Sequence, residues 1–177
     1  AQAKAAEEHF FGTSIPDSEN ERILAQLRQE TTNIVLIGMP GCGKTTVGEA
    51  LARLTGREAI DIDQRIVRAA GRSIPDIFAR EGEAAFRELE RRETAEAGKL
   101  SGKIIPTGGG VVKDFRNSAS LHQNSRIYHL IRDLSALPTD GRPLSQGADL
   151  NAMWVQREPM YTRFRDAVID NNDTVEH

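Results

Sequence analysis

Short apolar runs rich in β-branched residues alternate along the chain with longer stretches of mixed apolar and polar residues. Five runs have the length and composition of buried strands, and they cover residues 33–38, 58–63, 103–110, 126–131 and 166–170. The intervening stretches that favour helix cover residues 46–55, 75–100, 114–123 and 149–164. Such alternation is typical of βαβ units on a parallel sheet. It predicts a three-layer α/β domain with right-handed crossovers.

Two segments depart from this pattern. Residues 1–30 begin with an alanine-rich helix candidate, and a linker and a second predicted helix follow it. Residues 135–149 are rich in proline, glycine and aspartate and poor in apolar side chains, which is typical of a mobile surface loop. We therefore expect residues 1–30 to form an N-terminal helical extension or linker, and residues 31–177 to form the α/β domain.

Composition narrows the function classes. The chain has 177 residues, enough for one domain with its own core, and a formal net charge of −3. This charge argues against a broad basic face for nucleic acid, and no apolar run is long enough to span a membrane. The single cysteine, Cys42, has no partner for an internal disulfide, which favours a reducing compartment. We expect a cytoplasmic protein without nucleic-acid or membrane partners.

A glycine-rich loop directly follows the first predicted strand. Residues 38–45 read GMPGCGKT and match the pattern G-x-x-x-x-G-K-[ST] between a strand and a helix. The glycines allow positive φ angles and bring backbone N–H groups close to a ligand, and the helix N-terminus favours an anion. Lys44 supplies a charge for the outer phosphates, and Thr45 offers a hydroxyl to Mg²⁺. A glycine turn that carries Lys-Thr by chance is the alternative, and the flanking strand and helix favour a nucleoside triphosphate site.

Asp61 and Asp63 stand at the end of the second predicted strand. Two residues apart on an extended strand, their side chains point to the same face. Ligands of open α/β sheets gather beyond the carboxyl ends of the strands. The pair could hold Mg²⁺ through water or accept a proton from a hydroxyl. Two solvated acids, or a helix N-cap at Asp63, are the simpler alternatives.

Three arginines and a second glycine cluster complete the candidate residues. Arg87 lies on a predicted helix with Glu83 four residues before and Glu90 three residues after, so surface ion pairs are its simpler explanation. The glycines at 108–110 permit close approach of the backbone to a small ligand or form only a turn. Arg142 lies in the predicted mobile loop, where it could swing over phosphates, and Arg157 precedes Pro159. For each arginine, a surface role is the alternative.

Taken together, these segments resemble one family. GMPGCGKTT, DIDQRI, GRSIPDIF, GEAAFRELE, TGGGVV, GRPL and REPMY follow one another in the order of shikimate kinase, from residue 33 to the end of the chain. The phosphate loop is shared by a superfamily, whereas the other segments in this order are more specific. The resemblance implies a five-stranded parallel sheet with a mobile lid. It also implies transfer of the ATP γ-phosphoryl group to the 3-hydroxyl of shikimate, within aromatic amino-acid biosynthesis.

The resemblance also implies roles for individual residues. Asp63 would bind shikimate hydroxyls and act as the base, while Arg87 and Arg157 would clamp the shikimate carboxylate. Thr45 would ligate Mg²⁺, and Asp61 would support the metal through water. The glycines that would line the substrate are Gly108, Gly109 and Gly110. The residues implied for ATP are Gly41, Cys42, Gly43, Lys44, Thr45, Thr46 and Arg142, of which Lys44 and the lid arginine Arg142 would also be catalytic.

The chain departs from the family pattern in several places. The lid segment looks short, and a second lid arginine has no clear match. An arginine that flanks adenine and a closing C-terminal helix have no counterpart after the last predicted strand. Residues 1–10 resemble the end of a shikimate dehydrogenase domain, which suggests a covalent fusion, and a helical extension that packs on the kinase is the alternative. Two other functions stay open: a related small-molecule kinase, such as a gluconate kinase, and a nucleotide-binding regulatory module.

Overall fold

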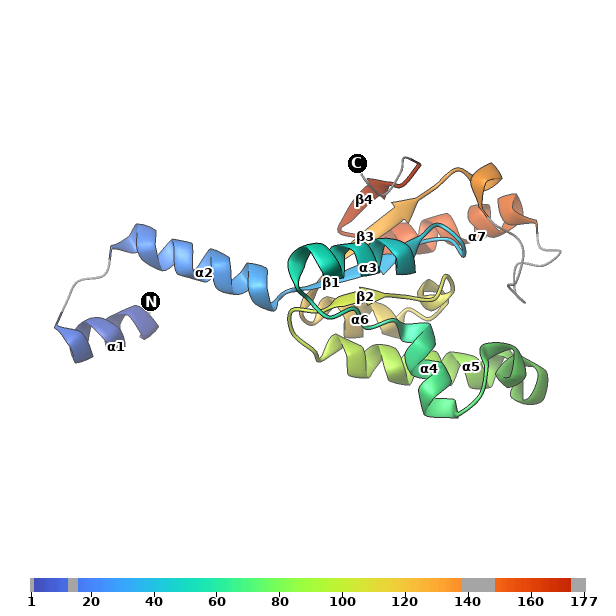
Figure 1. Cartoon of the computed structure of the whole chain (residues 1–177), viewed down its shortest axis with the longest axis horizontal. Coiled ribbons are helices and arrows are strands. Elements are labelled where there is room, and N and C mark those ends of the chain that lie inside the picture. Colours follow the sequence, from blue (N-terminus) through green and yellow to red (C-terminus); the bar gives the residue numbers. More distant parts are fainter. Residues whose placement is uncertain (1, 13–15, 138–148, 173–177) are drawn as a thin grey trace.

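A parallel sheet of four strands forms the centre of the molecule (Figure 1). The computed structural model describes residues 2–12, 16–137 and 149–172. The strands are β1 (Asn33–Ile37), β2 (Ile104–Pro106), β3 (Ser125–Ile131) and β4 (Ala167–Asp170), in the spatial order β2-β1-β3-β4. All neighbouring strands pair in parallel. The predicted α/β class with a parallel sheet is therefore confirmed.

The second predicted strand, 58–63, is reduced to a single bridge, so the expectation of five strands is corrected to four. Ala59 pairs in parallel with Ile104 at the free edge of β2, where a fifth strand would lie. The Asp61 carboxylate then accepts a hydrogen bond from the Gln64 N–H at 3.1 Å and caps a helix, which ends the extended backbone. Asp61 and Asp63 consequently lie at a helix N-terminus and not on one face of a strand.

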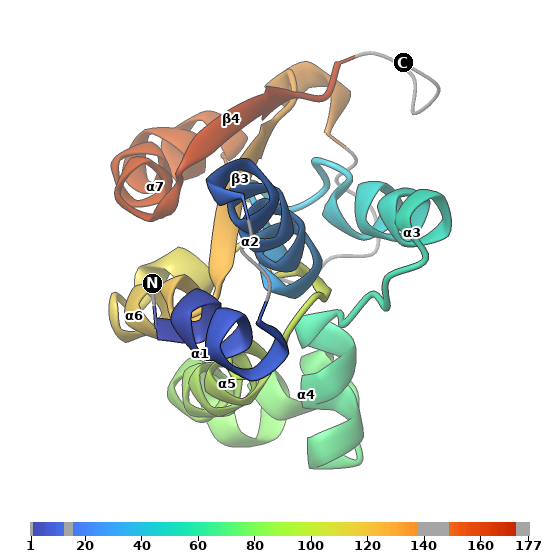
Figure 2. The same cartoon turned by 90° about the vertical axis from the view of Figure 1, so that its left-hand side faces the viewer.

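Helices cover both faces of the sheet. Helix α3 (Lys44–Thr55) packs on β1 and β2, and α6 (Arg116–His122) packs against β3. Figure 2 shows α3 on one side of the strands and α6 on the other, together with α7 (Leu150–Phe164). Helices α4 (Ile62–Ala70) and α5 (Ile74–Gly98) pack against each other, and α5 also packs against α6. This arrangement confirms the predicted three layers.

Helix α5 is interrupted at Gly82, which has φ 81° and ψ 177°. A positive φ of this size favours glycine, because a Cβ atom would be strained there. The interruption divides α5 into residues 74–81 and residues 83–98. Glu83 and Arg87 consequently lie in the first turns of the second helical segment, where the helix dipole favours a carboxylate.

The core lies between the sheet and these helices. The largest fully buried side chains are Leu36, Ile37, Ile62, Ile66, Ile77, Ile104, Ile105, Leu121, Ile127, Leu130, Tyr161 and Phe164. Burial of each such side chain contributes about 1.5–3 kcal/mol. The central strands are therefore held firmly, and so are the loops that leave their carboxyl ends. Two short 3₁₀ helices, η1 (Val111–Lys113) and η2 (Leu134–Ala136), follow β2 and β3.

The two helices predicted within residues 1–30 are present as α1 (Gln2–Phe11) and α2 (Asp17–Thr31). They extend away from the sheet (Figure 1), and α2 has no buried residue. The end of α2 is tied to the domain, because the Thr31 carbonyl accepts a hydrogen bond from Gly102 at 2.7 Å. Within the described ranges, no helix is both long and apolar enough to cross a membrane.

Candidate active site

The glycine-rich loop between β1 and α3 has the conformation that its sequence predicts. Gly38, Gly41 and Gly43 have φ angles of 146°, 88° and 96°. A Cβ atom on Gly38 would lie 2.5 Å from the Leu130 carbonyl oxygen, and one on Gly43 would lie 2.8 Å from Asn171 Nδ2. At both positions, the backbone angle and the neighbouring atoms each favour glycine. The loop ends at the N-terminus of α3, whose first N–H groups have no partner within the helix.

Lys44 lies across the loop that precedes it. Its Nζ donates to the carbonyl oxygens of Gly38 and Met39, each at 2.9 Å, and the side chain is buried. The ammonium group is thus held at the loop, where the phosphates are predicted to bind. The thiol of Cys42 is fully buried behind the loop, while Thr46 is exposed on the first turn of α3.

Asn171 contacts this loop, and the sequence did not predict that contact. It follows β4, and its Nδ2 donates to the Cys42 carbonyl oxygen at 2.7 Å, while its own N–H donates to the Ile131 carbonyl. The contact joins segments 129 residues apart. No local pattern marks such a contact, because a single asparagine after a strand is ordinary.

Thr45 and Asp61 meet beside the loop. The Thr45 hydroxyl donates to Asp61 Oδ2 at 2.9 Å, and Asp61 Oδ1 caps α4. A hydroxyl and a carboxylate oxygen are the hard ligands that Mg²⁺ prefers, and Mg²⁺ takes few protein ligands when it also binds phosphates. The described residues contain no group of three or more His, Cys, Asp or Glu side chains with metal-ligand geometry. The pair therefore fits a magnesium ion that is bound mainly through phosphate and water.

The second glycine cluster joins the phosphate loop to the acidic residues. A Cβ atom on Gly108 would lie 2.7 Å from Asp63 Oδ1 and 3.1 Å from Glu90 Oε1. A Cβ atom on Gly109 would lie 2.7 to 2.8 Å from three atoms of Pro40, which belongs to the phosphate loop. Both glycines are needed for close approach and not for an unusual backbone angle. Asp63 is thereby placed within reach of the phosphate loop, although it lies on a helix and not on a strand.

The third glycine of the cluster and its neighbour meet two arginines. A Cβ atom on Gly110 would lie 2.6 Å from both Nη atoms of Arg87. The carbonyl oxygen of Gly109 accepts hydrogen bonds from Arg157 Nη1 at 3.2 Å and from the Tyr161 hydroxyl at 2.6 Å. Arg87 from α5 and Arg157 from α7 therefore flank the same short loop, as the proposed carboxylate clamp requires.

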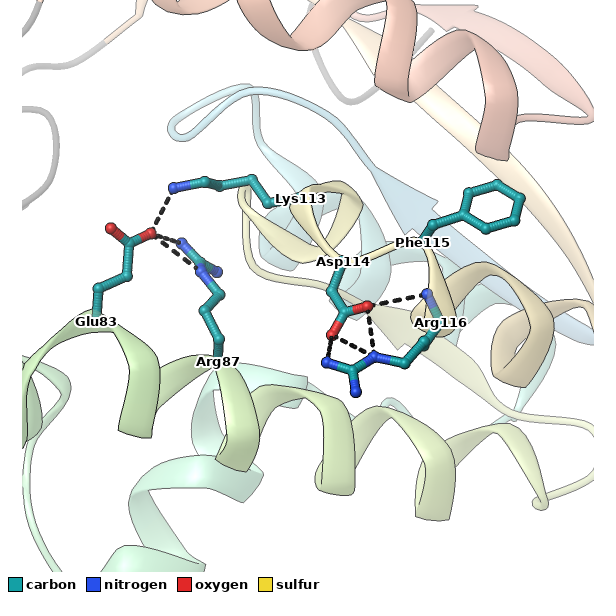
Figure 3. A pocket seen from close by; sticks show the side chains of 6 residues that line it. All are labelled: Glu83, Arg87, Lys113, Asp114, Phe115 and Arg116. Carbon is teal, nitrogen blue, oxygen red and sulfur yellow. Dashed lines mark hydrogen bonds and ion pairs between the residues drawn. The ribbon is translucent and has the colours of Figure 1, made fainter.

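Arg87 also makes the two ion pairs that its helical spacing predicts, and Figure 3 shows the one with Glu83. Its Nη1 donates to Glu90 Oε2 at 2.5 Å, while Nε and Nη2 both donate to Glu83 Oε1, at 3.2 and 3.1 Å. Lys113 Nζ contacts the same Glu83 oxygen. The ion pairs predicted for Arg87 are therefore confirmed, and its role toward a substrate stays a prediction.

Burial changes the ionisation of Glu90. Its carboxyl is fully buried, and this desolvation raises its pKa to about 7, against the lowering effect of Arg87 and with a further increase from Asp63. Its Oε2 accepts from Arg87, and its Oε1 has no hydrogen-bond partner in the described part of the chain. The Glu90 carboxyl is consequently protonated more easily than an exposed glutamate.

Arg157 is buried with an unused donor. Only 7% of the residue is exposed, and its Nε has no partner among the residues that the structure describes. A buried N–H group without a partner is costly, so the arrangement favours an incoming acceptor. Tyr161, one turn further along α7, stacks on His129 of β3 at 4.6 Å between ring centroids. In the sequence, the one sign of Tyr161 was its spacing, since it is an aromatic residue one helical turn after Arg157.

Most of the predicted mobile loop, 135–149, lies outside the described residues, since residues 138–148 with Arg142 are not described. The segment resumes at Asp149, whose side chain accepts hydrogen bonds from Asn151 N and Ala152 N and caps α7. The lid and the role of Arg142 stay predictions.

The fold and this site define a class. A parallel sheet whose first strand leads through a glycine-rich loop into a helix, with a buried lysine on that loop, is a P-loop nucleoside triphosphate site. Beside it lies a second group of residues with two arginines and a carboxylate, which suits an anionic acceptor.

Comparison with known proteins identifies the family. The model of the family described as "Shikimate kinase" matches residues 40–177. A shikimate kinase of Synechococcus sp. (strain RCC307) is 40% identical over 144 residues, which cover 76% of this chain and 73% of the relative. One of Stenotrophomonas maltophilia (strain K279a) is 39% identical over 149 residues, with 79% and 83% covered. The chain therefore belongs to the shikimate kinase family, and it is an ATP-dependent kinase.

Solved structures agree with this assignment. A shikimate kinase from Acinetobacter baumannii in complex with shikimate superposes with a TM-score of 0.72 at 30% identity, over 83% of this chain and 87% of that chain. A shikimate kinase from Aquifex aeolicus gives the same TM-score at 25% identity. The family assignment confirms the predicted resemblance. It does not support the two alternatives, which were a gluconate-kinase-like enzyme and a regulatory module without transferase activity.

Proposed function

We propose that this chain transfers the γ-phosphoryl group of ATP to the 3-hydroxyl of shikimate and releases shikimate 3-phosphate. The loop at 108–110 carries this proposal. It contacts Pro40 of the phosphate loop, Asp63, Arg87 and Arg157 within three consecutive residues. In-line phosphoryl transfer needs donor and acceptor to be held together, and one short loop between both groups of residues serves that purpose.

Arg87 and Arg157 are assigned to the carboxylate of the acceptor. A small polyhydroxylated acid has little apolar surface, so its orientation depends on charge-assisted hydrogen bonds, each contributing about 1.5–3 kcal/mol. The free Nε of the buried Arg157 supports this role. The backbone of Gly108, Gly109 and Gly110 lines the same space.

Asp63 is assigned to the acceptor hydroxyl. It lies against Gly108, on the side of the loop that also approaches Pro40. From there its carboxylate can orient the 3-hydroxyl and take up its proton as the phosphoryl group transfers. In a loose transition state, orientation contributes at least as much as early proton removal. General-base assistance is typically about 10²–10⁴-fold.

The phosphate side is assigned to the residues from Gly41 to Thr46, with Arg142 from the lid. Lys44 exchanges its bonds with the loop carbonyls for phosphate oxygens, and the N-terminus of α3 favours the negative charge. Thr45 and Asp61 are the residues that would hold Mg²⁺, Asp61 through water. The ion would neutralise the charge that develops on the phosphates.

The remaining assignments concern the whole chain. We assign residues 31–177 to the kinase domain and residues 1–30 to an N-terminal extension. A fusion to a shikimate dehydrogenase domain and a cytoplasmic location stay predictions, and ATP and shikimate are the expected small-molecule partners.

An ADP-release assay over a panel of acceptors tests the proposed reaction. Shikimate, gluconate, other hydroxy acids, sugars and nucleosides are offered with MgATP, and the phosphorylated position is assigned by ³¹P–¹H NMR. Shikimate is expected to give the largest kcat/KM and a 3-phosphate. A larger kcat/KM for gluconate, or ADP release that no acceptor stimulates, would contradict the proposal.

A further inference from the structure

One carboxylate-binding edge of Arg87, formed by Nε and Nη2, is already occupied by a carboxylate of the protein. An arginine binds a carboxylate best through one flat edge of its guanidinium group, with two parallel N–H donors. On Arg87, the Nε and Nη2 edge donates to a single oxygen of Glu83, and Nη1 is taken by Glu90. A substrate carboxylate that binds this edge must therefore replace Glu83.

The two ion pairs of Arg87 differ in how easily they exchange. The side chain of Glu83 is 47% exposed, whereas that of Glu90 is 1% exposed. Solvent-exposed pairs contribute little, because water and ions screen them, while separating a buried pair is costly. Glu90 consequently keeps Arg87 in place, and Glu83 is the partner that can leave.

Lys113 offers Glu83 a second partner. Its Nζ contacts the same Glu83 oxygen that faces Arg87, and this contact is the main reason that the pKa of Glu83 lies below its ordinary value. The neighbouring Arg116 is committed to Asp114, with bonds of 2.9 and 2.7 Å, so it does not compete. An open pocket of about 390 Å³ adjoins the pair (Figure 3), and its lining residues are Glu83, Arg87, Lys113, Asp114, Phe115 and Arg116.

We propose that Glu83 holds the carboxylate-binding edge of Arg87 while the acceptor site is empty, and that Lys113 retains Glu83 when the substrate carboxylate takes its place. Lys113 and Glu83 are then positioning residues that set the affinity for the acceptor without touching the reacting atoms. The break in α5 at Gly82 lies directly before Glu83, so this carboxylate stands at the start of a helical segment. The inference rests on the proposed role of Arg87.

Three variants test this exchange by KM for shikimate and by calorimetric binding. Glu83→Gln removes the competing charge and is expected to lower KM by about two- to fivefold, the range of an exposed ion pair. Lys113→Gln leaves Glu83 on Arg87 and is expected to raise KM by a similar factor. The double variant is expected to match Glu83→Gln, because Lys113 acts only through Glu83. KM for MgATP and kcat at saturation stay unchanged.

A matched pair of controls lies at the C-terminal end of α5. Glu96 and Lys99 form an exposed ion pair at 2.6 Å away from the pocket, so Glu96→Gln and Lys99→Gln make the same charge changes without an expected effect on KM. An unchanged or higher KM in Glu83→Gln would overturn the inference, since Glu83 would then not compete with the substrate. An equal rise in KM for Lys113→Gln with and without Glu83 would also overturn it, because Lys113 would then bind the substrate directly.

The proposed function is tested separately by Arg87→Ala. If Arg87→Ala loses shikimate binding but Glu83→Gln leaves KM for shikimate unchanged, only the exchange of Glu83 for the substrate carboxylate is refuted. Unchanged shikimate binding in Arg87→Ala refutes the assignment of Arg87 itself.

Discussion

The proposed phosphate side and the proposed acceptor side of this site are built from different parts of the chain. Residues 38–45 form the phosphate loop as one continuous segment between β1 and α3. The acceptor side draws Asp63 from α4, Arg87 from α5, Arg157 from α7 and a glycine cluster from the loop after β2. One side is therefore fixed by local sequence, and the other is fixed by packing.

The two sides also differ in how their charges are held. Lys44 is buried against carbonyl oxygens of its own loop, so the phosphate side keeps its shape through backbone contacts. On the acceptor side, Arg87 is shared between the buried Glu90 and the exposed Glu83. In the proposed mechanism, Lys44 leaves carbonyl oxygens of its own loop to bind phosphate, whereas Arg87 leaves another side chain, Glu83, to bind a carboxylate.

The largest expected effect comes from Asp63→Asn, at the junction of the two sides. The variant keeps the shape of the side chain but loses its charge and its capacity to take up a proton. We expect phosphoryl transfer to fall by at least about a hundredfold, with MgATP binding and the melting temperature nearly normal. Steady-state kinetics, calorimetry and thermal melting measure the three quantities.

Asp61→Asn is the matched control for that experiment. It makes the same change two residues away, beside Thr45, and is expected to shift the dependence on Mg²⁺ with a smaller loss at saturating metal. Near-normal turnover in Asp63→Asn would remove the carboxylate from the mechanism.

A smaller effect is expected from Arg157→Ala, which acts on the acceptor side alone. Loss of one buried charge-assisted contact weakens shikimate binding by about 2 kcal/mol, or about thirtyfold. MgATP affinity is expected to stay the same. Arg163→Ala on the exposed face of α7 controls for loss of charge on that helix. Calorimetry that found the same shikimate affinity in Arg157→Ala and in the original protein would show the clamp to be misassigned.

The last prediction concerns stability, for which two buried groups, Glu90 and His129, have opposite pH dependences. Because they oppose each other, the net effect in the original protein is expected to be the smallest. Burial raises the pKa of Glu90 from 4.5 to about 7, so its protonated form favours folding, and stability falls as pH rises from about 4.5 to about 7. Burial, with Arg165, lowers the pKa of His129 from 6.5 to about 4, so stability falls as pH drops through that range. In the original protein the two contributions oppose each other.

Variants of these two groups separate the contributions. Chemical unfolding between pH 4.5 and 7.5 is expected to show stability rising with pH in Glu90→Gln and falling with pH in His129→Phe, which keeps a ring against Tyr161. If the free energy of unfolding depended on pH in both variants as it does in the original protein, neither group would titrate as described.

The sequence predicted the phosphate side better than the acceptor side for a physical reason. Glycine spacing, Lys44 and Thr45 determine a local conformation, and the structure reproduces it. Asp61 and Asp63 were placed on a strand, because an apolar run before them has strand composition, but the Asp61 side chain caps a helix and ends the run. Side-chain capping competes with strand pairing at a sheet edge, and composition alone does not reveal which wins.

The acceptor residues could be named from the sequence, but their contacts could not. Spacing on a helix predicted both ion pairs of Arg87, and the structure contains them. The contacts of Gly109 with Pro40 and of Asn171 with Cys42 join residues far apart in the chain. Such contacts depend on how the strands are ordered, which no local pattern gives.

The most direct test of the account is the binding of both substrates to Gly110→Ala. The central claim is that the loop at 108–110 joins a fixed phosphate side to a separate acceptor clamp. The atoms nearest to a Cβ on Gly110 belong to the end of Arg87, whereas those nearest to a Cβ on Gly109 belong to Pro40 of the phosphate loop. We expect calorimetry to show weaker shikimate binding and unchanged MgATP binding in Gly110→Ala, with both weakened in Gly109→Ala. Unchanged shikimate affinity in Gly110→Ala, or an equal loss of MgATP affinity, would contradict the account.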